Sequence, residues 1–369
     1  MNARPARPVR KPYRLGVLVD IPGTPGLSDA FPEGVRFGLE LAHEQGLVDR
    51  PVEVVVREAY GQPWSDAQPV LNAFAELAAE GVLGVAGPFA SDNCMAILPE
   101  VERLGLPTIA MCGTSDFVGP HAFILPNGSL GDEPGIIASW LAANHLTRVA
   151  VLAERPSQIA DEYLRYFGWA AAEHGLKLIH EVGVPPAGEA DEVKEAMLEL
   201  AASEPDALAY LGFGSLYQHL GPALEACGWD PPRITGTAFI GATYNRRFAE
   251  CLEGWIGVDQ YDERNRRLQW VVAELARRDR LAVPNSSTSV GFDIGSVFGR
   301  ALGRMTPATR AGLRSAIETV RGVPASSGAP GNLITFGPWD HRGFKGVYQV
   351  LRRAQGGTTH FVGTPTVDN

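Results

Sequence analysis

The stretch GVLGVAGPFASDNCMAILPEVERLGLPTIAMCGTSDF, residues 81–117, decides the fold class. Its two apolar runs, 82–86 and 107–111, lack the polar alternation of half-exposed strands, and such runs are typical of buried parallel strands. Between them, apolar side chains recur at helical spacing, at Ile97, Leu98, Val101 and Leu104. The stretch is therefore predicted to be a βαβ unit with a right-handed crossover.

Small polar residues follow both strands of this unit. Ser91 and Asn93 come after the first strand, and Thr114 and Ser115 come after the second. In open α/β sheets the ligand crevice lies at the carboxyl ends of the strands, so we expect these side chains at a binding site. They could hold a carboxylate or amide oxygen at a helix N-terminus, or they could only cap the helices.

The rest of the chain repeats the alternation of strand and helix, and its 369 residues are too many for one ordinary core. The pattern predicts an α/β fold class with two doubly wound parallel sheets. Strands are expected at 15–20, 52–57, 123–125, 149–153, 178–182, 207–211, 234–237 and 255–259, a loop at 239–244, and a hairpin that closes a sheet edge at 332–353.

Charge and composition restrict the partners. The formal net charge of -10 disfavours nucleic acid and anionic membrane surfaces, and no apolar run approaches the roughly 18–20 residues of a transmembrane helix. The basic N-terminal segment 1–13 leads into the first strand without an apolar segment, so no secretory signal is predicted. The expected location is the cytoplasm, or the periplasm or cell surface if the signal is missing from this sequence.

The motif search does not favour an enzyme. No GxSxG, HExxH, P-loop or GxGxxG motif follows a strand, although a catalytic triad assembled across the fold stays open. The four cysteines form no CxxC pair and have no histidine at metal-ligand spacing, so we expect free thiols, with a Cys94–Cys112 bridge as the alternative, and no metal or cofactor. Aromatic residues instead recur at the strand exits, as a pocket wall would require: Trp64, Phe89, Phe213, Tyr217, Phe239 and Tyr261.

The order of several motifs resembles the type I periplasmic binding proteins, in the branched-chain amino acid and amide branch of the ABC-transporter substrate-binding proteins. The resemblance runs from Arg14 to about Arg353. Its carriers are LGVLVDIPGTPG (15–26), EGVRFGLELA (33–42), GVAGPFAS (84–91), LPTIAMCGTSD (106–116), EGWIGVDQY (253–261), GFDIGSVFGRAL (291–302) and ITFGPWDHRGFKGVYQVLR (334–352).

This resemblance implies two lobes that are joined by hinge crossovers and close on a ligand. We expect residues 14–127 and about 262–325 in the first lobe, and about 128–261 and 326–355 in the second. Residues 1–13 and 356–369 are expected to be tails.

The resemblance also implies the site residues. Ser91 and Thr114 match residues that grip the ligand's carboxylate or amide. Backbone groups and walls would come from Phe89, Ala90, Cys112 and Gly113, and second-lobe contacts from Ile159, Phe213, Tyr217, Phe239 and Gly241. We add Asn93, Ser115 and Tyr261 from their positions at the strand exits.

One departure from the family pattern concerns the ligand. Amino-acid binders usually place an acidic residue in the loop that here reads AFIGAT, residues 238–243, so an α-ammonium group has no evident partner there. An amino acid, an amide, a urea-like compound and an apolar carboxylate all stay open. The expected function is a solute-binding protein for an ABC importer, with a permease and ATPase as partners. The alternative is a cytoplasmic sensor of amide-type molecules that signals to a soluble regulator.

Overall fold

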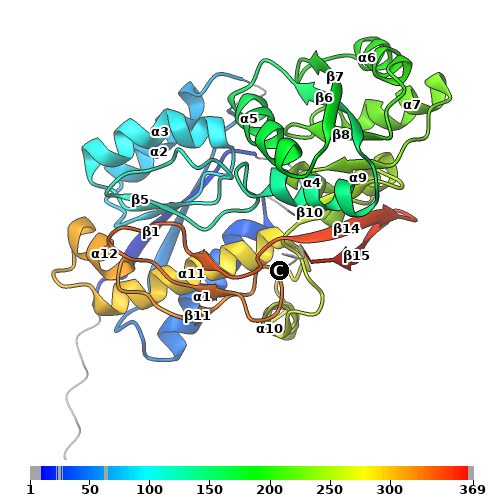
Figure 1. Ribbon diagram of the computed structural model, residues 1–369. Helices are drawn as coiled ribbons and strands as arrows, with labels where there is room; N and C mark the ends of the chain where they lie inside the picture. The colour runs from blue at the N-terminus through cyan, green and yellow to red at the C-terminus, as the bar shows by residue number, and fades with distance from the viewer. Residues whose placement is uncertain (1–9, 22, 24–25, 27, 62–64, 365–369) are drawn as a thin grey trace, which may run out of the picture.

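The computed structural model describes residues 10–21, 23, 26, 28–61 and 65–364. Trp64 and most of the basic segment 1–13 lie outside these residues. The described chain forms two lobes, each built on a sheet with helices on its faces (Figure 1). In Figure 1 the first lobe carries the blue, cyan, yellow and orange segments, and the second carries the green segments and the red C-terminal hairpin. The predicted α/β class is confirmed.

The first lobe contains a five-stranded, fully parallel sheet in the order β2-β1-β3-β4-β5. Its strands are β1 (Tyr13–Val19), β2 (Val52–Glu58), β3 (Val85–Ala86), β4 (Thr108–Ala110) and β5 (Ala122–Ile124). The predicted βαβ unit is present as β3, α3 (Ser91–Leu104) and β4. Both of its strands are buried, as their unbroken apolar runs predicted.

Helices α1 (Ala30–Glu44) and α11 (Ser286–Arg304) cover one face of this sheet and lie directly against each other. A Cβ atom on Gly38 would lie 2.7 Å from the backbone nitrogen of Ser296, and one on Gly295 would lie 2.3 Å from the carbonyl oxygen of Val35. Glycines in both helices therefore allow the two backbones to meet. The other helices of this lobe are α2 (Gln68–Ala79), α10 (Arg266–Arg277) and α12 (Arg310–Ile317).

The second lobe contains a seven-stranded sheet in the order β15-β14-β10-β9-β8-β6-β7. Five strands are parallel: β6 (Arg148–Glu154), β7 (Lys177–Val184), β8 (Ala207–Leu211), β9 (Arg233–Thr235) and β10 (Ile256–Asp259). Its helices are α4 (Glu133–Ala143), α5 (Gln158–Glu173), α6 (Ala190–Ala202), α7 (Tyr217–Cys227), the 3-10 turn η1 (Thr237–Phe239), α8 (Ile240–Tyr244) and α9 (Arg246–Cys251). The loop predicted at 239–244 is wrong, because these residues are helical.

The C-terminal region also differs from the prediction. Within the predicted hairpin 332–353, β12 (Leu333–Ile334) pairs with β13 (Phe344–Lys345) and, on its other side, with β11 (Val323–Pro324), which gives a small separate sheet. The hairpin that closes the second sheet is β14 (Val350–Gln355) with β15 (Thr358–Gly363), antiparallel to β10. Part of the predicted tail 356–369 is therefore a strand. Gly356 and Gly357, both at positive φ, form the two-residue turn that this hairpin needs.

The chain passes between the lobes three times, at 125–132, 260–265 and 346–349. Two of the passages are bonded to each other, because the backbone nitrogen of Gly128 donates to the side-chain oxygen of Gln260. The third passage joins them through the segment after β11, because the backbone nitrogen of Gly328 donates to the carbonyl of Gln260 at 2.7 Å and that of Ala329 donates to the carbonyl of Val347 at 3.0 Å. The connections between the lobes are thus held as one bundle.

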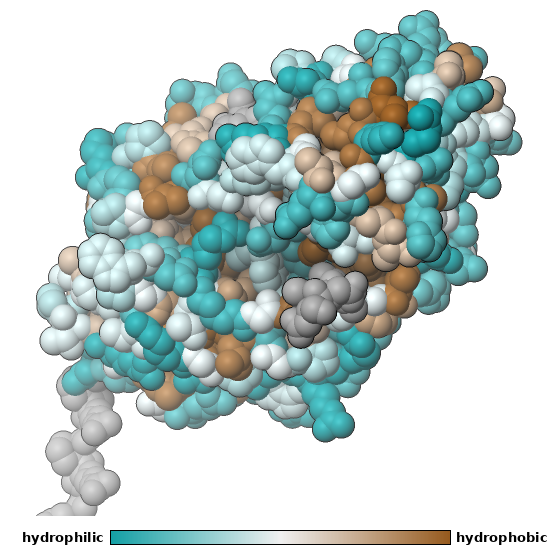
Figure 2. Space-filling model, viewed as in Figure 1, coloured by the Kyte–Doolittle hydropathy of each residue, from teal (hydrophilic) through white to brown (hydrophobic). Residues whose placement is uncertain are grey.

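The surface is mainly hydrophilic on the face shown in Figure 2, where apolar patches are interrupted by polar side chains. Across the part of the chain that the structure describes, no helix combines the length and the apolar character needed to cross a membrane.

Candidate ligand-binding site

A small cavity of about 50 Å³ lies between the lobes, at the carboxyl ends of their parallel strands. Pockets for drug-sized ligands measure roughly 300–1,000 Å³, so the cavity in this state has room only for a very small molecule. The first lobe lines it with Phe89, Ser91 and Gly113, the first connection and α4 with Asn127, Gly128, Ser129, Leu130 and Glu133, and the second lobe with Ile159, Tyr163, Gly212, Phe213 and Ala238.

Five residues predicted from the sequence line this cavity: Phe89, Ser91, Gly113, Ile159 and Phe213. Two of them meet across the lobes, because the rings of Phe89 and Phe213 lie edge to face with centroids 5.9 Å apart. Their contact forms an apolar wall with material from both halves of the chain.

A buried carboxylate fixes the first-lobe loop behind this wall. Asp20 follows β1 and accepts hydrogen bonds from the backbone nitrogens of Phe89 and Ala90, at 2.8 and 2.9 Å. The side-chain amide of Asn93 donates to the same carboxylate at 2.9 Å. Ala90 in the loop and Asn93 in the first turn of α3, both predicted as ligand contacts, are therefore buried and do not line the cavity.

In the second lobe a buried carboxylate fixes a loop in the same way, at Glu154, the last residue of β6. Its buried carboxylate accepts from the backbone nitrogens of residues 213, 214 and 215, at 2.8, 2.9 and 2.7 Å, and from the Tyr210 hydroxyl. Asp259, at the end of β10, accepts from the backbone nitrogen of Tyr261 at 3.1 Å. Burial raises the pKa of the carboxyl groups of Asp20, Glu154 and Asp259, although their hydrogen bonds act in the opposite direction.

A further carboxylate joins the lobes directly. Glu162, on α5 of the second lobe, accepts from the Thr114 hydroxyl at 2.7 Å and from the backbone nitrogen of Ser115 at 3.1 Å. The backbone nitrogen of Thr114 donates to the Ser91 hydroxyl oxygen at 3.2 Å. Thr114 and Ser115 therefore contact the opposite lobe, whereas only Ser91 of this group lines the cavity.

Asn127 is the lining residue whose polar atoms are least satisfied. Its side chain is 2% exposed, yet neither its amide nitrogen nor its amide oxygen has a hydrogen-bond partner. Buried amides are almost always paired, so Asn127 is an exception among the residues that line the cavity.

Glu133 and Tyr163, which both line the cavity, are bonded to each other. The Tyr163 hydroxyl donates to the Glu133 carboxylate, which also accepts from the backbone nitrogen of Ser129 at 2.6 Å and from the Gln349 side chain at 3.2 Å. Gly236 makes room for this pair, because a Cβ atom there would lie 1.7 Å from the Tyr163 hydroxyl oxygen and 2.4 Å from a Glu133 carboxylate oxygen.

The substitution Gly236→Ala is expected to displace the Tyr163 hydroxyl and to lower the free energy of unfolding by about 1–3 kcal/mol, the usual cost of overpacking. Urea unfolding measures this change. Gly168→Ala on the same helix as Tyr163 is the matched control, because nothing lies within 4 Å of the added methyl group, and it should stabilise by about 0.5–1 kcal/mol. Equal effects from both substitutions would contradict the close fit at Gly236.

The remaining predicted site residues lie away from the cavity. Cys112 is buried in the core of the first lobe, and Tyr217 and Phe239 are buried in the core of the second. Gly257 accommodates the Phe239 ring, because a Cβ atom at this position would lie 1.9 Å from the ring. Gly241 packs near Phe248, and Tyr261 lies under the Arg352 guanidinium, 4.6 Å from the ring centroid.

Sequence reasoning missed Asn127, Glu133 and Tyr163 at the cavity and the carboxylates that organise it. One signal was present: Asp20, Glu154 and Asp259 each stand at the carboxyl end of an apolar strand. A carboxylate at that place is out of reach of bulk water once the neighbouring loop folds over it.

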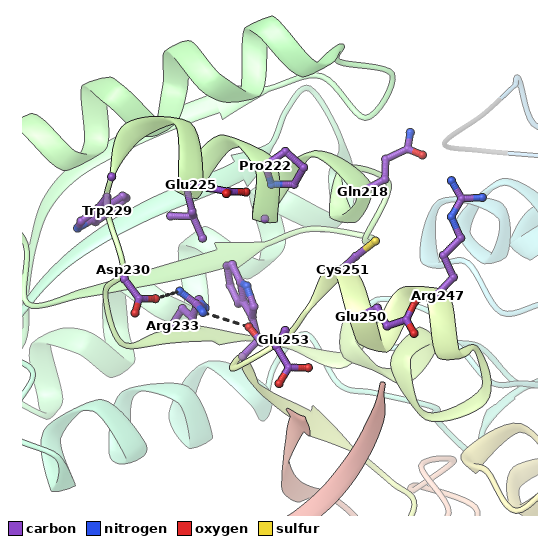
Figure 3. A pocket seen from close by; sticks show the side chains of 14 residues that line it. Gln218, Pro222, Glu225, Trp229, Asp230, Arg233, Arg247, Glu250, Cys251 and Glu253 are labelled. Atoms are coloured by element: carbon purple, nitrogen blue, oxygen red, sulfur yellow. Dashed lines mark hydrogen bonds and ion pairs between the residues drawn. The ribbon is translucent and has the colours of Figure 1, made fainter. Parts of the chain in front are cut away.

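Open grooves also lie outside the cavity, and two of them bear on where a ligand could bind. One, of about 470 Å³, borders the Glu162 contact and is lined by Asp116, Pro156, Ser157, Asp161, Glu162 and Arg165. The other, of about 730 Å³, lies on the second lobe around α7 and α9 (Figure 3). There Arg233 pairs with Asp230 at 2.5 Å and with the carbonyl of Glu253 at 3.1 Å. Only the second lobe lines this groove, so lobe closure cannot enclose it. Among the described residues no cluster of His, Cys, Asp or Glu could hold a metal ion.

Comparison with known proteins adds a family match. A family model described as "Periplasmic binding protein" matches residues 12–357. No curated protein sequence matches the chain. Among solved structures, a leucine-binding protein of Thermotoga maritima has 20% identity and a TM-score of 0.76, covering 96% of this chain and 99% of that one.

Two further solved structures contain a bound molecule according to their names. An ABC transporter substrate-binding protein of Desulfitobacterium hafniense in complex with Leu has 17% identity and a TM-score of 0.76, covering 95% of this chain and all of that one. A solute-binding protein of an ABC transporter from R. palustris in complex with benzoate has 17% identity and a TM-score of 0.73, covering 97% and 98%. At these identities the likeness concerns the fold.

Proposed function

Because the chain belongs to the periplasmic binding protein family, we propose that it is a solute-binding protein that captures a small organic ligand between its lobes for an ABC importer. The observation that carries this proposal is the cavity lined by both lobes and by their first connection. The candidate ligands are an amino acid, an amide or a small carboxylate. The leucine and benzoate complexes of similar folds support a small organic solute.

The proposed mechanism is closure about the bundled connections between the lobes. A ligand stabilises the closed form only through contacts that the open form lacks. Closing forms the contact between Phe89 and Phe213 and the bonds from Thr114 to Glu162, and it completes the cavity wall. The closed form is then the one that a permease would recognise.

Thermal unfolding with a panel of leucine, valine, benzoate, small amides and urea tests this function. A ligand present at 100 times its dissociation constant should add about 2.7 kcal/mol to the stability of the native protein. Absence of any shift across the panel, for a protein that unfolds cooperatively, would contradict solute binding by this cavity.

The cavity itself is tested by the substitution Ser91→Ala. Loss of one hydrogen bond to the ligand should weaken binding of the panel hit by roughly tenfold. Gln218→Ala, at an exposed position in the groove of the second lobe, is the control and should leave the affinity unchanged. If only Gln218→Ala weakened binding, the ligand site would be the groove of Figure 3. Isothermal titration calorimetry gives both affinities.

A further inference from the structure

A buried carboxylate without a partner lies where the lobes meet. Asp92, in the first turn of α3, is 9% exposed, and one of its oxygens is fully covered and has no hydrogen-bond partner. The buried carboxylates at the strand ends, Asp20, Glu154 and Asp259, each accept hydrogen bonds from backbone nitrogens. Buried charges are almost always paired, so the charged form of Asp92 is unfavourable in this state of the protein.

Asp92 lies close to a carboxylate of the opposite lobe. Helix α3 contacts α5 across the lobes, and the two helices are neighbours in Figure 1. Ser91, which precedes Asp92, accepts from the backbone nitrogen of Thr114 at 3.2 Å. The Thr114 hydroxyl donates in turn to Glu162 at 2.7 Å. This short series of bonds brings Asp92 and Glu162 to the same contact between the lobes.

The two carboxylates differ in their hydrogen bonds. Glu162 accepts from Thr114 and from the backbone nitrogen of Ser115. Burial, and then the charge of Glu162, raise the pKa of Asp92 to about 6, and neither a hydrogen bond nor a cation acts in the opposite direction. Hydrogen bonds to a carboxylate favour its charged form, so Asp92 is the member of the pair that takes up a proton.

The other charged groups of α5 and its surroundings do not neutralise Asp92. Asp161 pairs with Arg155 at 2.9 Å. The Arg165 guanidinium lies over the Tyr166 ring, 4.9 Å from its centroid. The contact between α3 and α5 therefore supplies no cation to Asp92.

Four charged or titratable groups of the first lobe also lie near this contact: Asp20, Cys94, Asp116 and Arg342. The Asp20 carboxylate accepts from the Asn93 side chain, and the Arg342 guanidinium donates to the carbonyl oxygen of Thr114 at 3.2 Å. Burial raises the pKa of the Cys94 thiol, so the thiol is uncharged, and Asp116 is exposed. None of these groups contributes to the pKa of Asp92.

We propose that closing of the lobes takes up a proton at Asp92, so that mildly acidic conditions favour the closed form and neutral conditions favour opening and release. The inference rests on the proposed function, from which it takes the closing of the lobes, and adds a regulator to it. Because α3 and α5 belong to different lobes, opening separates Asp92 from Glu162 and admits water between them. The proton then binds the closed form better than the open form, as a shift of this equilibrium requires.

The size of the effect follows from the two states of Asp92. With a pKa of about 6 in the closed form and the ordinary 3.8 in the open form, ligand binding should be roughly tenfold tighter at pH 5 than at pH 7.5. Binding should take up about 0.8 proton at pH 5 and almost none at pH 7.5. The affinity therefore falls as the pH rises through 6 and is constant above about 7.

Isothermal titration calorimetry at pH 5, 6 and 7.5 tests the proposal with those of leucine, valine and acetamide that bind the protein, because none of the three changes its charge in this range. Buffers of different ionisation enthalpy report the protons taken up. Asp92→Asn keeps the site uncharged, so its affinity should vary less than twofold with pH. Asp116→Asn is the matched control at an exposed carboxylate and should keep the tenfold variation.

The Glu162→Gln variant tests the contribution of the opposite lobe. It removes the charge but keeps an oxygen that can accept from Thr114. The variation of affinity with pH should become smaller than tenfold without disappearing, because burial is the larger cause of the shift at Asp92. A variation as large as that of the unaltered protein would overturn the role of Glu162.

Small-angle X-ray scattering of the ligand-free protein separates the inference from the proposed function. The radius of gyration should be smaller at pH 5 than at pH 7.5, and Asp92→Asn should keep the smaller value at both. If this change occurs but none of the compounds binds, solute binding by the cavity fails and the proton-linked closing stands. A radius of gyration or an affinity that does not vary with pH, or whose variation survives in Asp92→Asn, would overturn the inference and leave solute binding to its own test.

Discussion

Replacing Glu154 with alanine is expected to lower the free energy of unfolding by about 3–4 kcal/mol. The substitution leaves three backbone nitrogens and the buried Tyr210 hydroxyl without their shared acceptor, at a residue that is 1% exposed. Each buried donor without a partner costs about 1–3 kcal/mol, and rearrangement of the loop at 212–215 recovers part of the sum. Urea unfolding monitored by circular dichroism measures the loss.

Two further variants show whether the Glu154 carboxylate is responsible for the loss of stability. Glu154→Gln keeps one acceptor oxygen and should lose an intermediate amount of stability. Glu181→Ala removes an exposed carboxylate on the neighbouring strand β7 and should change stability by less than about 0.5 kcal/mol. A loss below about 1 kcal/mol for Glu154→Ala would show that the loop does not depend on this carboxylate.

Replacing Asp92 with asparagine is expected to stabilise the protein by up to about 3 kcal/mol at pH 7.5. Burial and the nearby charge of Glu162 raise the pKa of the Asp92 carboxyl from 3.8 to about 6, and one of its oxygens has no hydrogen-bond partner. Between these two values the folded protein binds a proton that the unfolded chain has released. The native protein therefore loses stability as the pH rises from about 4 to about 6, and the deficit is complete above that range.

Urea unfolding at several pH values between 4 and 8 tests whether stability falls as the pH rises. The stability difference between Asp92→Asn and the unaltered protein should be smallest near pH 4 and should grow as the pH rises through 6. Asp293→Asn is the control: burial also raises its pKa to about 6, but its carboxylate accepts from the Ser326 and Ser327 backbone nitrogens. An amide there loses acceptor capacity, so no comparable gain is expected. A difference for Asp92→Asn that does not vary with pH would contradict the titration.

The sheets were predictable because strand identity is encoded locally. The apolar run 149–153 became β6 (Arg148–Glu154), and the run 207–211 became β8 with the same bounds. The run 82–86 shortened to Val85–Ala86, although the backbone nitrogen of Leu83 still pairs with Arg14. The C-terminal hairpin was misplaced because the turn at Gly356 and Gly357 was not recognised as its centre.

The candidate site was less predictable because its contacts join distant parts of the chain. The bond from Phe89 to Asp20 spans 69 residues, and the bond from Thr114 to Glu162 spans 48. In the sequence alone each carboxylate resembles an ordinary solvated side chain, and nothing local shows that it will be buried against backbone nitrogens. Five of the predicted contact residues do line the cavity, because their strand exits were placed correctly.

The position of the hairpin β14–β15 has a consequence for the time at which the second lobe can be completed during synthesis. Strand β10 ends at Asp259, but its partner β14 begins only at Val350. At about 5–20 residues per second, a ribosome needs roughly 5–20 s to make the roughly 90 residues between them. For that interval β10, a buried strand in the finished protein, is the edge strand of the sheet, a position prone to pairing with other chains. The last part of the chain therefore covers β10 and moves this edge of the sheet to β15.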